Sequence, residues 1–234
     1  MTNIGKDSRI VGFWYLLLVF IGLLDLMYIP SKLFVHADAA ATVANITVHQ
    51  TLFQIGIAAS LVGGVVLIFL TMAFYRLFKD VDQYQAVLLV ITGGILPAAI
   101  SFSGVASDAA TLILVRGADY LNVFSEAQRS ALAYFFARVS FQVTVGSEIL
   151  WGVWLFPMAI LVLKSRWFPR LLGWWLIVNG IAYLVQWYTG MFMPDHYNTV
   201  QNYLFPLELG EVAFVLWLLI IGARERSAEV AAAR

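Results

Sequence analysis

The sequence predicts an all-α polytopic membrane protein, a bundle of six transmembrane helices with both termini in the cytoplasm. The chain is 62% hydrophobic and only 12% charged, which is far more apolar than a soluble domain of this length. Six apolar runs are long enough to cross a hydrocarbon core of about 30 Å, which takes about 20 helical residues. Lys and Arg gather at alternate ends of these runs, and this pattern gives the orientation.

The expected spans lie near residues 9–31, 51–77, 86–115, 138–163, 170–193 and 203–223. Under strict alternation ten Lys and Arg residues fall on one side of the membrane and four on the other. Short cytoplasmic loops carry the excess of positive charge, so we expect both termini in the cytoplasm. With an odd number of spans, the Lys and Arg residues would no longer be concentrated on one side of the membrane. We therefore expect one transmembrane domain over residues 1–226 and a polar tail at 227–234.

The first span is expected to remain in the mature protein. Lys6 and Arg9 precede it as in a signal peptide, but Asp25 follows where a cleavage site would need small residues. The chain has no cysteine, which excludes disulfides, thiolate metal sites and cysteine nucleophiles. No basic tract resembles a nucleic-acid footprint, so nucleic acid is not an expected partner.

Local signals define the remaining elements. Asp38 can cap a short surface helix after the first span. Span 2 carries Gly56, Ser60 and Gly64 at four-residue spacing, the pattern of close helix packing in lipid. The segment from Gly93 to Pro97 should bend span 3, because glycine and proline free backbone groups.

A long helix is expected to begin outside the membrane and enter it as span 4. Ser125 and Gln128 have the spacing of a capping box. Continued to Lys164, this helix would measure about 60 Å, which exceeds the bilayer, so its first turns must stand outside or in the interface. A short basic turn joins it to span 5, and Glu148 lies inside the apolar part, where a carboxylate is costly.

Four polar residues are expected at one depth in the membrane. Each lies 16 residues from a basic residue at the cytoplasmic flank of its span: Asp25, Glu148, Gln186 and Glu208. At 1.5 Å per residue this depth is about 24 Å from the inner flank, in the outer part of the core. Glu211 shares a helix face with Glu208, and Asn179, Tyr183 and Gln186 share a face of span 5.

Because lipid-facing carboxylates are strongly disfavoured, these groups should point into the bundle. We interpret them as an outward-opening, acidic, aromatic-lined pocket for a small cationic or amphipathic molecule, so the expected partners are the bilayer and a small-molecule or lipid ligand. Asp108 and Gln142 should lie nearer its mouth. The candidate ligand-binding residues are Asp25, Glu148, Asn179, Tyr183, Gln186, Glu208 and Glu211.

Other interpretations stay open. A carboxyl in a span can be a protonated hydrogen-bonding group that ties helices together, as in a structural subunit, and Asn179 and Gln186 can donate interhelical hydrogen bonds. A small transporter could use the layer as a proton or ion path. A membrane-embedded metal-dependent hydrolase could use Glu148 or Glu211 as general base with His49 as a zinc ligand.

Sequence motifs give the enzymatic alternative little support. His36, His49 and His196 lie in or beside outer loops without an HExxH spacing, so no metal site is predicted. No GxSxG, P-loop or GxGxxG occurs. The sequence names no cofactor, and no motif assigns a catalytic residue.

The chain resembles a family of bacterial membrane proteins catalogued as domain of unknown function 4386. The resemblance is carried by GSEILWGVWLFPMAILVLKSRWFPRLLGWWLIVNGIAYL, LELGEVAFVLWLLIIGARER, RIVGFWYLLLVFIGLL and HADAAATVANI, and it covers nearly the whole chain. It implies a multi-span protein of the bacterial inner (cytoplasmic) membrane. It implies no activity and carries over no catalytic residues.

Overall fold

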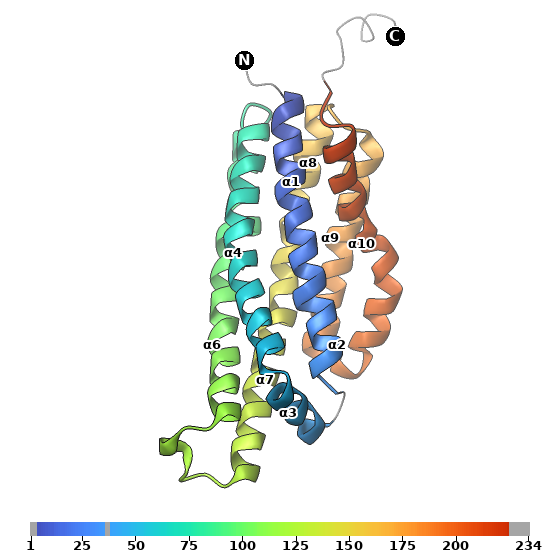
Figure 1. Ribbon diagram of the computed structural model, residues 1–234. Helices are drawn as coiled ribbons and strands as arrows, with labels where there is room; N and C mark the ends of the chain where they lie inside the picture. Colours follow the sequence, from blue (N-terminus) through green and yellow to red (C-terminus); the bar gives the residue numbers. More distant parts are fainter. Residues whose placement is uncertain (1–3, 36–37, 225–234) are drawn as a thin grey trace, which may run out of the picture. The chain divides into compact units, whose positions relative to one another are not determined.

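The computed structural model describes residues 4–35 and 38–224, and within them all regular structure is helical (Figure 1). This confirms the predicted all-α class. Five helical segments are long and apolar enough to cross a membrane, as expected of a multi-pass membrane protein: Ile4–Leu33, Gln50–Phe78, Gln83–Arg116, Glu126–Ser165 and Pro194–Ile220. The predicted polar tail at 227–234 lies outside the described residues.

The expected fifth span forms a helix that is not among these five. Helix α9 (Arg170–Phe192) has 23 residues, so it is about 35 Å long, which suffices to cross the core. It is less apolar than the others because it carries Asn179, Gln186 and several Trp and Tyr residues. It packs against α8 (Leu155–Ser165) and α10 (Tyr197–Ile220) (Figure 1).

Contacts divide the chain into two compact units. Among the described residues, unit 1 contains residues 4–17, 66–97 and 146–224, and unit 2 contains residues 18–35, 38–65 and 98–145. Unit 1 therefore holds the beginning of α1 (Ile4–Gly22), the end of α4 (Gln50–Phe78), α5 (Gln83–Val90), the end of α7 (Glu126–Val153), and α8 to α10.

The core of unit 1 is aromatic. The ring of Phe74 stacks on those of Phe78 and Phe214, and Trp154 meets Tyr15 and Phe74 edge-on. Trp154 lies against Gly93, where a Cβ atom would overlap the indole ring. The backbone between α5 and α6 (Leu96–Arg116) forms a π-helical turn at Ile91–Ile95, which overlaps the segment where a bend is expected.

Four segments of unit 1 meet at one end of the unit. Lys164 Nζ lies 2.6 Å from Asp82 Oδ2, which joins the end of α8 to the turn between α4 and α5. The backbone N–H of Ala223, just after α10, donates to Ser8 Oγ at 2.9 Å. The N–H of Arg224 donates to the carbonyl of Trp167 at 3.3 Å, in the turn between α8 and α9. The beginning of α1 and the end of α10 therefore lie at the same end as both turns.

Unit 2 has a separate apolar core, formed by α2 (Ile29–Leu33), α3 (Ala39–Val48), α4 and α6. Its buried members are Ile29, Leu33, Ile46, Phe53 and Leu112.

Both predicted helix caps lie in unit 2 and are confirmed. Asp38 accepts a hydrogen bond from the N–H of Ala41 at 2.9 Å. Ser125 and Gln128 exchange reciprocal hydrogen bonds at the start of α7, which runs with α8 over 40 residues. The expected long helix is therefore present.

Candidate functional site

Seven polar side chains from α1, α7, α9 and α10 form a connected network in unit 1. We call it the carboxyl–tyrosine cluster, and it consists of Tyr15, Glu148, Asn179, Tyr183, Tyr197, Glu208 and Glu211. Five of the seven sequence-predicted candidates belong to it. Tyr15 and Tyr197 were not among the predicted site residues.

Glu211 is the best-satisfied carboxylate of the cluster. The hydroxyls of Tyr15 and Tyr183 donate to it, and so does Asn179 Nδ2 at 3.4 Å. Asn179 is fully buried, and its Nδ2 also donates to the backbone carbonyl of Glu208 at 3.0 Å. One turn earlier on α9, Trp175 Nε1 donates to the carbonyl of Leu207 at 3.0 Å. These bonds fix α9 against α10.

Glu148 and Glu208 are less well satisfied. Glu148 is only 3% exposed, and one of its oxygens accepts from the hydroxyl of Tyr197 at 2.5 Å. Within the described part of the chain, Glu148 Oε2, Glu208 Oε1 and Asn179 Oδ1 are buried without a hydrogen-bond partner. Glu148 and Glu208 also lie close enough to repel each other when both are ionised. The cluster thus presents buried acceptors without enough donors, an arrangement that is costly unless something neutralises it.

A close crossing of two backbones positions Glu148. A Cβ atom at Gly152 of α7 would lie 2.7 Å from the carbonyl oxygen of Gly180 on α9, and one at Gly180 would lie 2.9 Å from the carbonyl oxygen of Gly152. One residue earlier on α7, Trp151 packs edge-on against Tyr183 at 6.0 Å between ring centroids. Only glycine permits this approach, which brings Glu148, one turn from Gly152, into reach of the other helices.

The same antiparallel crossing gives the height of Gln186. Trp151 packs against Tyr183, and Gly152 packs against Gly180, so the two helices run in opposite directions. Three residues after Tyr183 on α9 is Gln186, and three residues before Trp151 on α7 is Glu148. Gln186 is therefore level with Glu148. It is 2% exposed, and its Nε2 donor is buried without a partner among the described residues.

The remaining predicted residues lie in unit 2. Asp25 is part of a π-helical turn, Leu23–Tyr28, and accepts a hydrogen bond from Ser60 Oγ at 2.6 Å. Asp108 on α6 interacts with Ser140 and lies within electrostatic range of Asp25. Gln142 lies on α7. Asp25 and Asp108 thus form a separate polar group within unit 2, and Gln142 is exposed on the surface.

Two open hollows on the surface have other linings. One of about 540 Å³ follows the start of α1, and one of about 410 Å³ is lined by residues of α7, including Arg138 and Gln142. Neither contains a member of the carboxyl–tyrosine cluster. In the part of the chain that the structure describes, no three His, Cys, Asp or Glu side chains are grouped so as to hold a metal ion. His36 lies outside that part.

A comparison with protein families gives one assignment. The family described as Domain of unknown function (DUF4386) matches residues 10–222, a stretch that contains the whole carboxyl–tyrosine cluster. No curated protein and no solved structure matches the chain. The match confirms the resemblance seen in the sequence motifs. The chain belongs to the DUF4386 family.

Proposed function

We propose that this protein is a six-span protein of the bacterial inner membrane, with both termini cytoplasmic, whose carboxyl–tyrosine cluster binds a small cationic molecule. Residues 1–226 form the membrane domain in this proposal, and α9 is the fifth of the six spans, in addition to the five long apolar segments. The ligand reaches the cluster from the outer side.

Contacts at one end of unit 1 support the six-span topology. The turn at 79–82, the turn at 166–169, the beginning of α1 and the residues after α10 meet there through hydrogen bonds and the ion pair of Lys164 with Asp82. These are the segments that the distribution of Lys and Arg assigns to the cytoplasm. Since α9 starts at this end and α10 returns to it, α9 must run the same distance as α10 in the opposite direction.

The unpartnered acceptors of Glu148, Glu208 and Asn179 carry the proposal of cation binding. Buried carboxylates are stable only when they are protonated, hydrogen-bonded or paired with a positive charge. An ammonium group has three donors and no acceptor, so it matches three acceptor oxygens that lack donors. The tyrosine hydroxyls and the amide of Asn179 already hold Glu211 in place.

Protons and cations compete for the same carboxylates in this arrangement. Without a cation, Glu148 and Glu208 cannot both be ionised at close range in a site of low polarity without a large energetic cost. A proton on one of them removes the repulsion, and a bound cation replaces that proton. Binding of the cation should therefore release a proton and weaken as the pH falls.

Cation binding is testable by thermal unfolding of the purified protein in one detergent. The probes are Na⁺, methylammonium and tetraphenylphosphonium, and the variants are Glu148→Gln and Glu208→Gln. A ligand at 100 times its dissociation constant stabilises the folded state by about 2.7 kcal/mol. We expect a melting temperature that rises with one of the probes in the parent and does not rise in either variant.

Glu126→Gln is the matched control, because Glu126 is exposed at the start of the same helix as Glu148. It should respond to the cation like the parent. Equal stabilisation of the parent and Glu148→Gln would contradict cation binding at the cluster. Stoichiometric zinc in elemental analysis would instead favour the hydrolase interpretation.

A further inference from the structure

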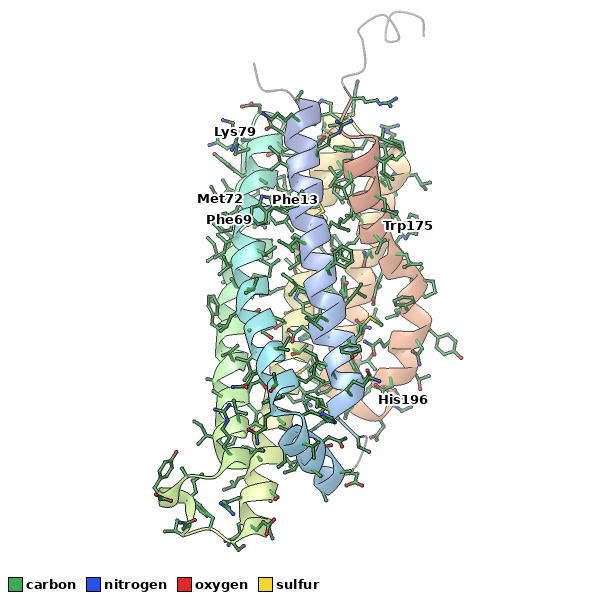
Figure 2. The ribbon with its side chains drawn as sticks, viewed as in Figure 1. Phe13, Phe69, Met72, Lys79, Trp175 and His196 are labelled. Atoms are coloured by element: carbon green, nitrogen blue, oxygen red, sulfur yellow. The ribbon has the colours of Figure 1, made fainter. Side chains whose placement is uncertain are left out.

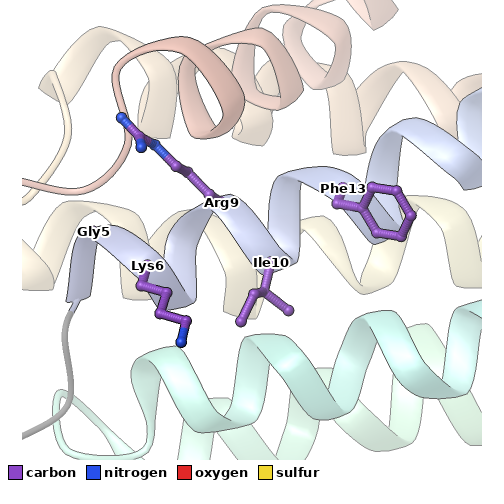
Figure 3. A pocket seen from close by; sticks show the side chains of 5 residues that line it. All are labelled: Gly5, Lys6, Arg9, Ile10 and Phe13. Carbon is purple, nitrogen blue, oxygen red and sulfur yellow. The ribbon is translucent and has the colours of Figure 1, made fainter.

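The hollow of about 540 Å³ along the start of α1 lies outside the carboxyl–tyrosine cluster and has a different chemistry. It is lined by Gly5, Lys6, Arg9, Ile10 and Phe13 (Figure 3). The four residues follow the spacing i, i+3, i+4 and i+7, which places them along one side of the helix. From there Lys6 projects toward α4 and Arg9 toward α10 (Figure 3). The volume is in the range of small-molecule sites.

This lining changes from basic to apolar along the helix axis. Lys6 and Arg9 occupy the end next to the start of the chain, and Ile10 and Phe13 occupy the other end. The step from Lys6 to Phe13 is about 10 Å along the axis. Phe13 is 58% exposed, which leaves a large apolar surface directly beside two positive charges.

Helix α4 extends the apolar part of this surface. Trp14 of α1 stacks on Phe69 of α4, with ring centroids 5.3 Å apart, so the two helices are adjacent here. Phe69 is 52% exposed and Met72 is also exposed, and Figure 2 shows both on the side of α4 next to Phe13. Lys79 follows at the basic end of α4. The combined surface has a basic end and an apolar body.

We propose that this groove binds an anionic phospholipid. The phosphate lies against Lys6 and Arg9, and an acyl chain covers Ile10, Phe13 and the exposed face of Phe69. Basic residues beside the cytoplasmic end of a span are suited to acidic headgroups. A soluble anion would contact the charges and leave the aromatic surface uncovered. A zwitterionic lipid carries no net charge for the two cations that flank the groove to attract.

This proposal is independent of cation binding at the carboxyl–tyrosine cluster, because the two sets of residues do not overlap. It needs only that the start of α1 lies at a membrane surface. Binding of the lipid would therefore persist in Glu148→Gln, and failure of one proposal leaves the other standing.

Native mass spectrometry of the full-length protein released from lipid nanodiscs tests the groove. The nanodiscs contain phosphatidylglycerol or phosphatidylcholine, and the test variant is the double substitution Lys6→Gln with Arg9→Gln. Each basic residue near an anionic surface contributes a factor of about five in affinity, so the double variant should retain phosphatidylglycerol about 30-fold more weakly. The parent should retain phosphatidylglycerol in preference to phosphatidylcholine.

The matched control removes two positive charges from the same end of unit 1 but outside the groove. Arg166→Gln with Arg170→Gln serves this purpose, since Arg166 is exposed in the turn before α9 and Arg170 is exposed as the first residue of α9. It should retain phosphatidylglycerol like the parent. Equal loss in both double variants would show a general charge effect and overturn the proposal, as would equal retention of both lipids by the parent.

A second variant separates a lipid from a free anion. Phe13→Asn keeps both charges and removes the apolar contact, so it should weaken retention of phosphatidylglycerol and leave any binding of inorganic phosphate unchanged. If inorganic phosphate displaces phosphatidylglycerol at equal concentration, or if Phe13→Asn has no effect, the groove is an anion site and the lipid proposal is wrong. Unchanged melting temperatures would show that these exposed substitutions leave the fold intact.

Discussion

Replacing Gly152 by Ala should separate two helices that carry the site. A Cβ atom at this position would lie 2.7 Å from the carbonyl oxygen of Gly180 and 3.0 Å from Leu184 Cγ. Ordinary contacts of a Cβ atom begin near 3.4 Å, so the backbones must move apart by several tenths of an ångström. The carbonyl oxygen belongs to a helix backbone and cannot swing away as a flexible side chain would. Overpacking of this kind costs about 1–3 kcal/mol.

Gly146→Ala is a matched control on the same helix. No atom lies within 4 Å of a Cβ built at Gly146, so the added methyl group meets open space. Alanine is favoured over glycine in a helix by about 0.5–1 kcal/mol. The two variants share this gain, and only Gly152→Ala adds the steric cost. Gly146→Ala should therefore stabilise the protein by about 0.5–1 kcal/mol, and Gly152→Ala should be about 1–3 kcal/mol less stable than Gly146→Ala.

Thermal unfolding in one detergent measures this difference. In a chain of this length 1 kcal/mol corresponds to a change of about 2–4 °C in melting temperature, so Gly152→Ala should melt several degrees below Gly146→Ala. Gly152→Ala should also lower cation binding, because it displaces Glu148. Equal melting temperatures for the two variants would refute the close crossing of α7 and α9.

Three further predictions concern unit 2, the ion pair of Lys164 with Asp82, and the topology. Gly56→Leu should lower the melting temperature, because even a Cβ atom at Gly56 would lie 3.4 Å from Ile29, and an unchanged value would mean that Gly56 faces lipid. The hydrogen bond from Lys164 lowers the pKa of Asp82, so this pair stabilises the fold above about pH 4 and less as the pH falls through the lowered pKa. Asp82→Asn should lose this part of the pH dependence in unfolding measured against pH, and an identical profile would contradict a role for the pair. Reporter fusions after Arg226 and within 78–85 should report a cytoplasmic location, and fusions near Asp119 and Asp195 should report a periplasmic one. A periplasmic C-terminus would contradict the six-span topology.

The helices of this protein could be predicted because their signals are local. Apolar length, the cap at Asp38 and the reciprocal pair of Ser125 and Gln128 depend on neighbours in sequence, and the structure contains all of them. Helix α9 shows the limit of apolarity as a signal. The polar side chains of Asn179 and Gln186 lower its hydropathy, and both are buried. A helix with a buried polar face therefore gives a weaker apolar signal than the other expected spans.

The candidate site could be predicted only in part. Counting along a helix gives the height of Glu148 or Glu208 but not the neighbour that each one faces. Tyr15 and Tyr197 therefore could not be recognised, since their hydroxyls meet carboxylates that are distant in sequence. Gly152 and Gly180 lie within expected spans, and glycine in a span indicates close helix packing. Unlike the glycines of span 2, they do not form a four-residue pattern that would single them out. Asp25 shares the counted depth, yet its hydrogen bond goes to Ser60 within unit 2, which sequence position does not reveal.

The protonation state of Glu148, Glu208 and Glu211 tests the proposed cation site most directly. Infrared difference spectra of the purified protein at neutral pH, recorded with and without the stabilising cation, distinguish a protonated carboxyl from a carboxylate. Without the cation we expect a carboxylic acid signal that disappears when the cation is added and is missing in Glu148→Gln or Glu208→Gln. If Glu148, Glu208 and Glu211 are all ionised at neutral pH with no cation bound, they are in contact with bulk water, and the buried cation site proposed for them does not exist.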